Sequence, residues 1–131
     1  MTEPTLTKVH SDARGEMYSI TIGDRELMLL HSKAGTLRGG HSHDVPEGVM
    51  VLTGKMRYHK LQQKTFRGEF REWDAQEVLT EGEYSFNPSG EPHMGEFVED
   101  TWILEWKICK DKHSWRNDDY EPWRAEVKAS A

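Results

Sequence analysis

The most constraining feature of this chain is a pair of histidines two residues apart, His41 and His43, followed closely by Pro46. Side chains at positions i and i+2 share a face only in an extended strand, because on a helix they point in different directions. Pro46 excludes a continuous helix through the segment, so the chain must bend before it reaches Glu47. The segment therefore predicts a strand, a turn and a second strand.

A third histidine, His93, ends a second segment that begins at Gly82. Together with His41, His43 and Glu47 it makes three imidazoles and one carboxylate, a donor set that suits a first-row transition metal. These ligand types allow Fe, Mn, Co, Ni, Cu or Zn, and they disfavour Ca and Mg, which prefer oxygen ligands. We therefore expect one divalent transition metal per chain, and the sequence leaves its identity open.

The spacing of these residues resembles the two sequence motifs of the cupin superfamily. The first motif is matched at Gly35, His41, His43, Glu47 and Gly54. The second is matched at Gly82, Pro88, Ser89, Gly90 and His93. The second motif usually ends in Asn, and this chain has Phe97 there, so an apolar ring replaces a polar group that faces the barrel. The two motifs span about half of the chain.

The resemblance implies an all-β fold, a double-stranded β-helix or jelly-roll barrel, with the metal held by His41, His43, Glu47 and His93. We expect one domain over residues 1–131, with an N-terminal arm at 1–15, the barrel at about 16–109 and a C-terminal tail at 110–131. Barrels of this kind commonly dimerise by pairing edge strands, so we also expect a homodimer.

Apolar and polar residues alternate in several short runs that predict strands. Glu16–Ile22 and Arg25–His31 flank Gly23-Asp24, which predicts a hairpin. Further strands are expected at 48–53, 56–61, 77–80, 84–87, 93–98 and 101–109, with 62–73 as an exposed strand-like or looped excursion. On the last strand the apolar side chains of Trp102, Leu104 and Trp106 share one face, which suggests that one face is core and the other mixed. Near the end, Asp119 is a candidate cap for a short helix that has Pro122 in its first turn and Trp123 as its apolar anchor.

Composition narrows the class of protein. A length of 131 residues suits one domain with a real core, and no apolar run is long enough to cross a bilayer. Residues 1–8 lack the pattern of a secretory signal, and the lone Cys109 fits a reducing compartment. A net charge of −6 disfavours nonspecific binding to nucleic acid or anionic membranes. We expect a cytoplasmic protein with a small-molecule substrate and neither a nucleic-acid nor a membrane partner.

Other polar and aromatic residues are candidates for roles beside the metal. Tyr58 and Glu105 are candidate acid–base groups, and Arg38 could bind an anionic substrate group by a bidentate contact. Three aromatic residues are candidates to line a substrate pocket: Phe97, Trp102 and Trp106. We assign ordinary surface or core roles to Arg14 and to the four remaining histidines, which are His10, His31, His59 and His113.

Three functions fit these features. The first is a metal-dependent enzyme on a small oxygen-bearing substrate, for which oxygenation is the commonest implication of a complete site of this kind. The second is an isomerase, epimerase or lyase acting on a sugar or sugar nucleotide; its metal-free form is disfavoured by Glu47, which is better explained by charge neutralisation of a cation. The third is a non-catalytic binding or sensing domain. A redox-active ion with dioxygen uptake would favour the first.

Overall fold

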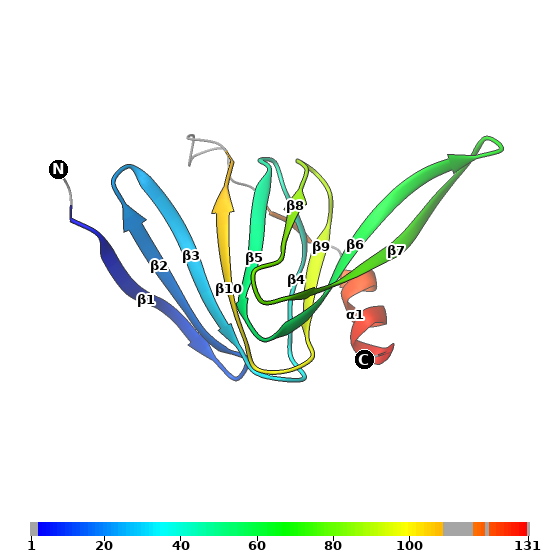
Figure 1. The fold of residues 1–131 in the computed structure, drawn as a ribbon. Helices are drawn as coiled ribbons and strands as arrows, with labels where there is room; N and C mark the ends of the chain where they lie inside the picture. The colour runs from blue at the N-terminus through cyan, green and yellow to red at the C-terminus, as the bar shows by residue number, and fades with distance from the viewer. Residues whose placement is uncertain (1–2, 109–116, 120, 131) are drawn as a thin grey trace.

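The chain folds into two antiparallel sheets that face each other, with one helix on the outside of the second sheet (Figure 1). This computed structural model describes residues 3–108, 117–119 and 121–130. The strands are β1 (Thr5–Asp12), β2 (Gly15–Ile22), β3 (Arg25–Ser32), β4 (Leu37–His43), β5 (Glu47–Thr53), β6 (Lys55–Phe66), β7 (Glu69–Thr80), β8 (Tyr84–Asn87), β9 (His93–Phe97), β10 (Thr101–Lys107) and β11 (Asn117–Asp119). The helix is α1 (Glu121–Ser130). This is the all-β jelly-roll barrel with a short C-terminal helix that the sequence predicted.

The order of strands in the sheets shows how distant segments meet. One sheet has six strands in the order β1-β2-β3-β10-β5-β8, and the other has five in the order β11-β4-β9-β6-β7. The predicted hairpin around Gly23-Asp24 is confirmed, since Ile22 pairs with Arg25. Strand β4, with two of the histidines, lies beside β9, which begins at the third. Chain segments fifty residues apart in sequence therefore form one surface inside the barrel.

Two features of the fold go beyond the predicted strands. The N-terminal segment contributes β1, which pairs with β2 along its length. The stretch 62–73 is strand-like: β6 and β7 continue through it as one long hairpin that projects from the barrel (Figure 1). Its outer part has few core contacts, and Phe70 and Trp73 on it are exposed.

The main core lies between the two sheets. Its buried members are Leu30, Val49, Val51, Met56, Tyr58, Leu79, Phe97 and Ile103. A second cluster forms where α1 packs on the outer side of the five-stranded sheet and consists of Leu61, Met94, Trp123 and Val127. Trp123 is the predicted anchor of the helix. Asp119 is not positioned as its cap, because it ends β11 and pairs with His41.

The orientation of β10 differs from the simplest reading of its sequence. Thr101 and Ile103 are buried and face the barrel interior, as does Glu105, which lines the interior cavity. The aromatic face, with Trp102 and Trp106, therefore points outward, because successive side chains on a strand alternate. The inner face was harder to recognise because it contains a threonine and a carboxylate.

No helix in the described part of the chain is long and apolar enough to cross a membrane. Two residues discussed from the sequence, Cys109 and His113, lie outside the described residues.

Candidate metal centre

A β-bulge in β4 places His41 opposite His93. Gly39 pairs with Met94, but the next pair is His41 with His93, so Gly40 is an extra residue in β4. In a regular ladder without the bulge, Gly40 would lie opposite His93, and the His41 side chain would point to the other face of the sheet. Gly39 and Gly40 have φ values of 100° and 86°, and a Cβ on Gly39 would lie 2.8 Å from the carbonyl oxygen of His93. Only glycine fits this geometry.

The bulge brings three imidazoles together. His41, His43 and His93 each offer a ring nitrogen, and these nitrogens lie within 4.8 Å of one another. The ring centroids are 4.6 Å apart for His41 and His43, and 5.1 Å apart for His43 and His93. His43 and His93 are buried and His41 is half-buried. One cation could therefore contact all three.

Glu47 enters the same site from the other sheet, as the first residue of β5 after the bend at Pro46. Its Oε1 lies 2.8 Å from Nε2 of His93, and its Oε2 lies 3.7 Å from Nε2 of His43. Burial raises the pKa of the Glu47 carboxyl, but the contacts with His93 and His43 outweigh it and hold the pKa below its ordinary value. The group is therefore a carboxylate at neutral pH. Asn87 donates a hydrogen bond of 3.2 Å to Oε1.

These donors fit a divalent transition metal. Nε2 of His93 is buried and makes no hydrogen bond in the described structure, although Oε1 of Glu47 lies close to it. The two atoms are therefore close together without making a well-aligned hydrogen bond to each other, while the cluster of mutually close donor atoms consists of the three histidines. Neutral imidazoles and a carboxylate provide a total charge of −1, which suits a 2+ ion.

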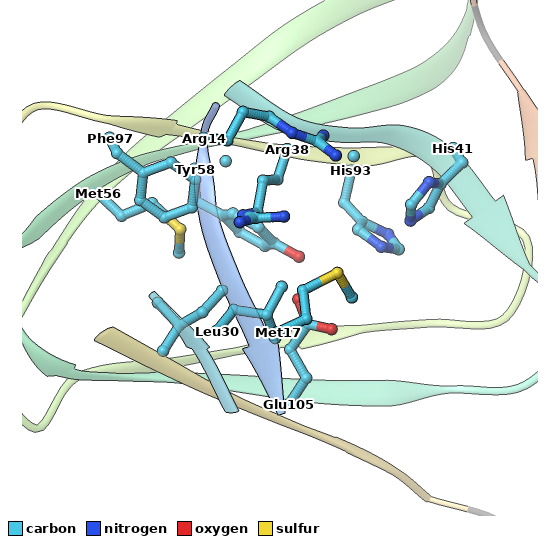
Figure 2. A pocket seen from close by; sticks show the side chains of 13 residues that line it. Arg14, Met17, Leu30, Arg38, His41, Met56, Tyr58, His93, Phe97 and Glu105 are labelled. Carbon is cyan, nitrogen blue, oxygen red and sulfur yellow. The ribbon is translucent and has the colours of Figure 1, made fainter. Parts of the chain in front are cut away.

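A cavity of about 200 Å³ adjoins the histidines inside the barrel. Figure 2 shows His41 and His93 at one end of it and Phe97 and Met56 at the other, with Arg38 between them. Pockets for drug-sized ligands have volumes of about 300–1,000 Å³, and a water molecule takes up about 30 Å³ of liquid. The cavity therefore suits a small organic molecule.

Arg38 supplies a buried positive charge in this cavity. It is 8% exposed, its Nε donates to Oγ of Ser32 at 2.6 Å, and its Nη2 donates to the carbonyl oxygen of His31 at 3.2 Å. These two bonds fix the guanidinium plane. The remaining terminal nitrogen, Nη1, makes no hydrogen bond to a described residue and so is available to an anionic ligand.

Two further groups in the cavity are held in their protonated forms. Burial and then the negative charges of Glu47 and Glu105 raise the pKa of the Tyr58 hydroxyl well above its ordinary value. Burial and then repulsion from Glu47 raise the pKa of the Glu105 carboxyl to about 8, against a smaller opposing effect of Arg38. What remains exposed of Glu105 faces the cavity. Both groups can therefore donate a proton or a hydrogen bond at neutral pH.

The structure separates the candidate pocket residues into two groups. Arg38, Tyr58, Phe97 and Glu105 line the cavity. Trp102 and Trp106, which the sequence also suggested for substrate binding, lie on the outer side of β10: the Trp102 ring stacks on His31, and Trp106 lies over Gly48. They are outside the cavity because they alternate with the inward residues.

The remaining described histidines have structural partners. His10 contacts Asp12 on the surface at 2.9 Å. His31 contacts Glu16 at 2.8 Å on the outside of the barrel. The buried His59 lies between two carboxylates, with Nδ1 2.9 Å from Asp74 and Nε2 3.0 Å from Glu96.

Three contributors to the site were not identified from the sequence. Asn87 bridges Glu47 and the hydroxyl of Tyr58, and its position directly before Pro88 in the second motif is a signal that could have revealed it. Ser32 orients Arg38, and no local pattern marks it. Arg124 of α1 donates to the carbonyl oxygen of Gly39 at 2.9 Å and so supports the bulge from outside.

Comparison with solved structures identifies the architecture. The chain superposes on the capsular polysaccharide assembling protein CapF from Staphylococcus aureus with a TM-score of 0.62 and 19% identity, covering 91% of this chain and 32% of that one. It superposes on an oxalate decarboxylase from Bacillus subtilis with a TM-score of 0.60 and 16% identity, covering 86% of this chain and 29% of that one. It superposes on the vicilin from Solanum melongena with a TM-score of 0.69 and 14% identity, covering 86% of this chain and 32% of that one. The chain has a cupin fold.

The cupin likeness is one of structure. No family model matches the sequence, and no curated protein matches it. The chain spans about a third of the length of the solved chains named above. At these identities the comparisons establish the cupin fold, while the chemistry must be argued from the residues of this chain.

Proposed function

We propose that this cupin is a metal-dependent enzyme that carries out an oxygenase-type reaction on a small, oxygen-bearing organic anion. The observation that carries the proposal is the position of the three-histidine cluster and Glu47 at one end of a cavity that also holds the buried cation Arg38. A purely structural histidine cluster needs neither an adjoining cavity nor an arginine with an available nitrogen.

In this proposal His41, His43, Glu47 and His93 hold the ion. A bound redox metal would supply the ability to bind dioxygen or to polarise a substrate oxygen. Four protein ligands would leave an octahedral ion with positions for small molecules, and the cavity is lined by two of these ligands, His41 and His93.

The cavity residues would bind and orient the substrate. Nη1 of Arg38 pairs with its anionic group, and the bonds from Arg38 to Ser32 and His31 keep the guanidinium in place. The hydroxyl of Tyr58, held by Asn87, can donate a hydrogen bond to a substrate oxygen. Protonated Glu105 is the candidate proton donor.

A sugar isomerase, epimerase or lyase is the second candidate, and a second pocket favours it. A groove of about 820 Å³ lies outside the barrel and shares Arg14 and Phe97 with the inner cavity. Arg57, Arg124 and Lys128 also line it, so a larger substrate with an anionic tail could extend into this groove. The neighbour CapF is a capsular polysaccharide assembling protein, which agrees with this candidate.

Elemental analysis of protein purified without added metal tests the metal-dependent proposal. We expect close to one transition-metal ion per chain in the wild type, a large loss in His41→Ala, and full retention in the control His10→Ala. His10 is a suitable control because its side chain is exposed and contacts Asp12 on the surface, away from the histidine cluster. Equal metal content in both variants would contradict the ligand assignment.

The identity of the ion and its reactivity then separate the candidates. A redox-active ion with dioxygen uptake in the presence of small carboxylic acids supports oxygenation. A redox-inert ion, with turnover of sugars in the absence of dioxygen uptake, supports the second candidate. Bound metal with no turnover of either class supports the non-catalytic binding alternative.

A further inference from the structure

Strand β9 turns three residues toward the inner cavity, and each meets a different part of it. His93, Gly95 and Phe97 alternate with Met94 and Glu96, so they share the inner face of the sheet. At about 3.3 Å per residue, the first and the last of them are roughly 13 Å apart along the strand. Between the candidate metal ligand and the aromatic ring, this strand therefore presents no side chain at all.

Gly95 keeps the middle of the cavity open. It pairs with Arg38 on one neighbouring strand and with Tyr58 on the other, so the two polar groups of the cavity stand on either side of it. A Cβ at this position would lie 2.8 Å from Sδ of Met56 and 3.2 Å from Cζ of Phe97. The φ of Gly95 is not positive, so the backbone would accept alanine. The glycine therefore matters for the space that it leaves.

Phe97 and Met56 form the end of the cavity opposite the histidines (Figure 2). The two residues pair directly across β9 and β6, and both side chains are fully buried. The backbone of Phe97 is held on both sides, because its carbonyl oxygen accepts from the amide of Gly35 at 2.8 Å and its amide donates to the carbonyl oxygen of Thr36 at 3.0 Å. The position of the aromatic wall is therefore fixed by the end of the barrel.

More space lies behind the Phe97 ring. The ring lines both the inner cavity of about 200 Å³ and the groove of about 820 Å³ outside the barrel. A smaller side chain at this position would join the two, and a long apolar chain could then pass from one into the other. The exposed rim of the cavity at Arg14 offers less, because that side chain is charged and pairs with Asp12 at 2.6 Å. Phe97 is therefore the residue that limits the length of an apolar chain.

We infer that Gly95 and Phe97 determine the size of the substrate and restrict it to short carboxylic acids. The inference rests on one part of the proposed function, the binding of an anionic group by Arg38. A carboxylate held there has the histidines on one side and the wall of Phe97 and Met56 on the other, so its carbon chain must fit over Gly95. At about 30 Å³ for each water-sized group, a cavity of about 200 Å³ holds about six or seven such groups, which corresponds to an acid of about four carbons.

The affinity of straight-chain carboxylates of increasing length tests the inference, measured by titration calorimetry or ligand-observed NMR on the protein as purified. We expect the wild type to bind butyrate about tenfold more tightly than octanoate, although an open apolar surface would favour the longer acid. Phe97→Ala should bind octanoate about tenfold more tightly than the wild type does, because the chain gains room. Gly95→Ala should weaken butyrate binding about tenfold, because the added methyl group fills the space over the strand.

Leu79→Ala is the matched control for the loss of a core side chain. Leu79 is a buried member of the same core as Phe97 but does not line the cavity. The control should lose stability, as Phe97→Ala does, and keep the wild-type preference for butyrate. If Phe97→Ala fails to fold, Phe97→Leu replaces it, because leucine is smaller and still apolar, and its octanoate affinity should rise in the same direction by a smaller factor.

Several results would overturn the inference. They are a wild type that binds octanoate as tightly as butyrate or binds neither acid, a folded Phe97 variant with the wild-type order of affinities, or a Gly95→Ala variant with unchanged butyrate affinity. Metal content measured on the same samples separates these results from a failure of the proposed function. A length limit in protein without bound metal would support the inference and contradict metal dependence, whereas bound metal without a length limit would contradict the inference alone.

Discussion

Glu105 should make the metal-free protein less stable as the pH rises, and the size of the effect follows from its position in the cavity. Its pKa is about 8 in the folded chain and 4.5 when exposed, a difference of about 3.5 units. At about 1.36 kcal/mol per unit, the difference corresponds to about 5 kcal/mol, an upper bound because water entering the cavity would reduce it.

The direction follows from proton binding. Between about pH 4.5 and pH 8 the folded state keeps the proton on Glu105 while the unfolded state releases it. The free energy of unfolding therefore falls as the pH rises through this range. Above about pH 8 both states have released the proton, so this group causes no further change. Replacing the carboxyl by an amide, in Glu105→Gln, removes this dependence.

Urea unfolding with a chelator present, at pH 5, 6.5 and 8, measures the effect. We expect Glu105→Gln to gain stability relative to the wild type as the pH rises, by up to about 5 kcal/mol at pH 8. The control Glu99→Gln removes an exposed carboxylate and should run parallel to the wild type. Parallel profiles for Glu105→Gln and the wild type would refute the reasoning.

Three further predictions follow from the site and the core. Gly40→Ala should lower metal affinity about tenfold in a metal titration, because the added Cβ would lie 2.5 Å from Nε of Arg124 and disturb the bulge. The control Gly82→Ala should leave the affinity unchanged, because Gly82 has a φ of 81°, close to the 86° of Gly40, but has nothing within 4 Å of an added Cβ. Ile103→Ala should lower the free energy of unfolding, measured with urea, by about 2–5 kcal/mol. The control Ile22→Ala, whose side chain is 54% exposed, should lower it much less, and equal losses would place Ile103 outside the core. Metal affinity should fall as the pH drops from 8 to 5, because protons compete for the imidazoles, and an unchanged affinity by calorimetry would argue against imidazole ligation.

The sequence was most informative where local chemistry and long-range structure agree. His41 and His43 had to lie on a strand, and Pro46 had to bend the chain before Glu47, so the two motifs predicted both the barrel and the residues that meet in it. The hairpin at Gly23-Asp24 followed from alternation and turn chemistry alone.

The sequence was less informative where one strand has two plausible faces. On β10 the aromatic side pointed to the core, but the inner side is built from Thr101, Ile103 and Glu105. The sequence named Glu105 as a candidate acid–base group, but its place on the inner face beside Arg38 follows only from the cavity. Likewise, the glycines before His41 marked a break, yet nothing local showed that it realigns His41 with His93.

The dependence of β4 on the C-terminal segment bears on biosynthesis. A nascent chain that has emerged through β10 already contains all four donor residues, but it lacks β11, which pairs with His41 and His43, and Arg124, which holds the bulge. Under the proposed metal-dependent function, ion binding should therefore be a late event of translation, after residues 117–130 have left the ribosome.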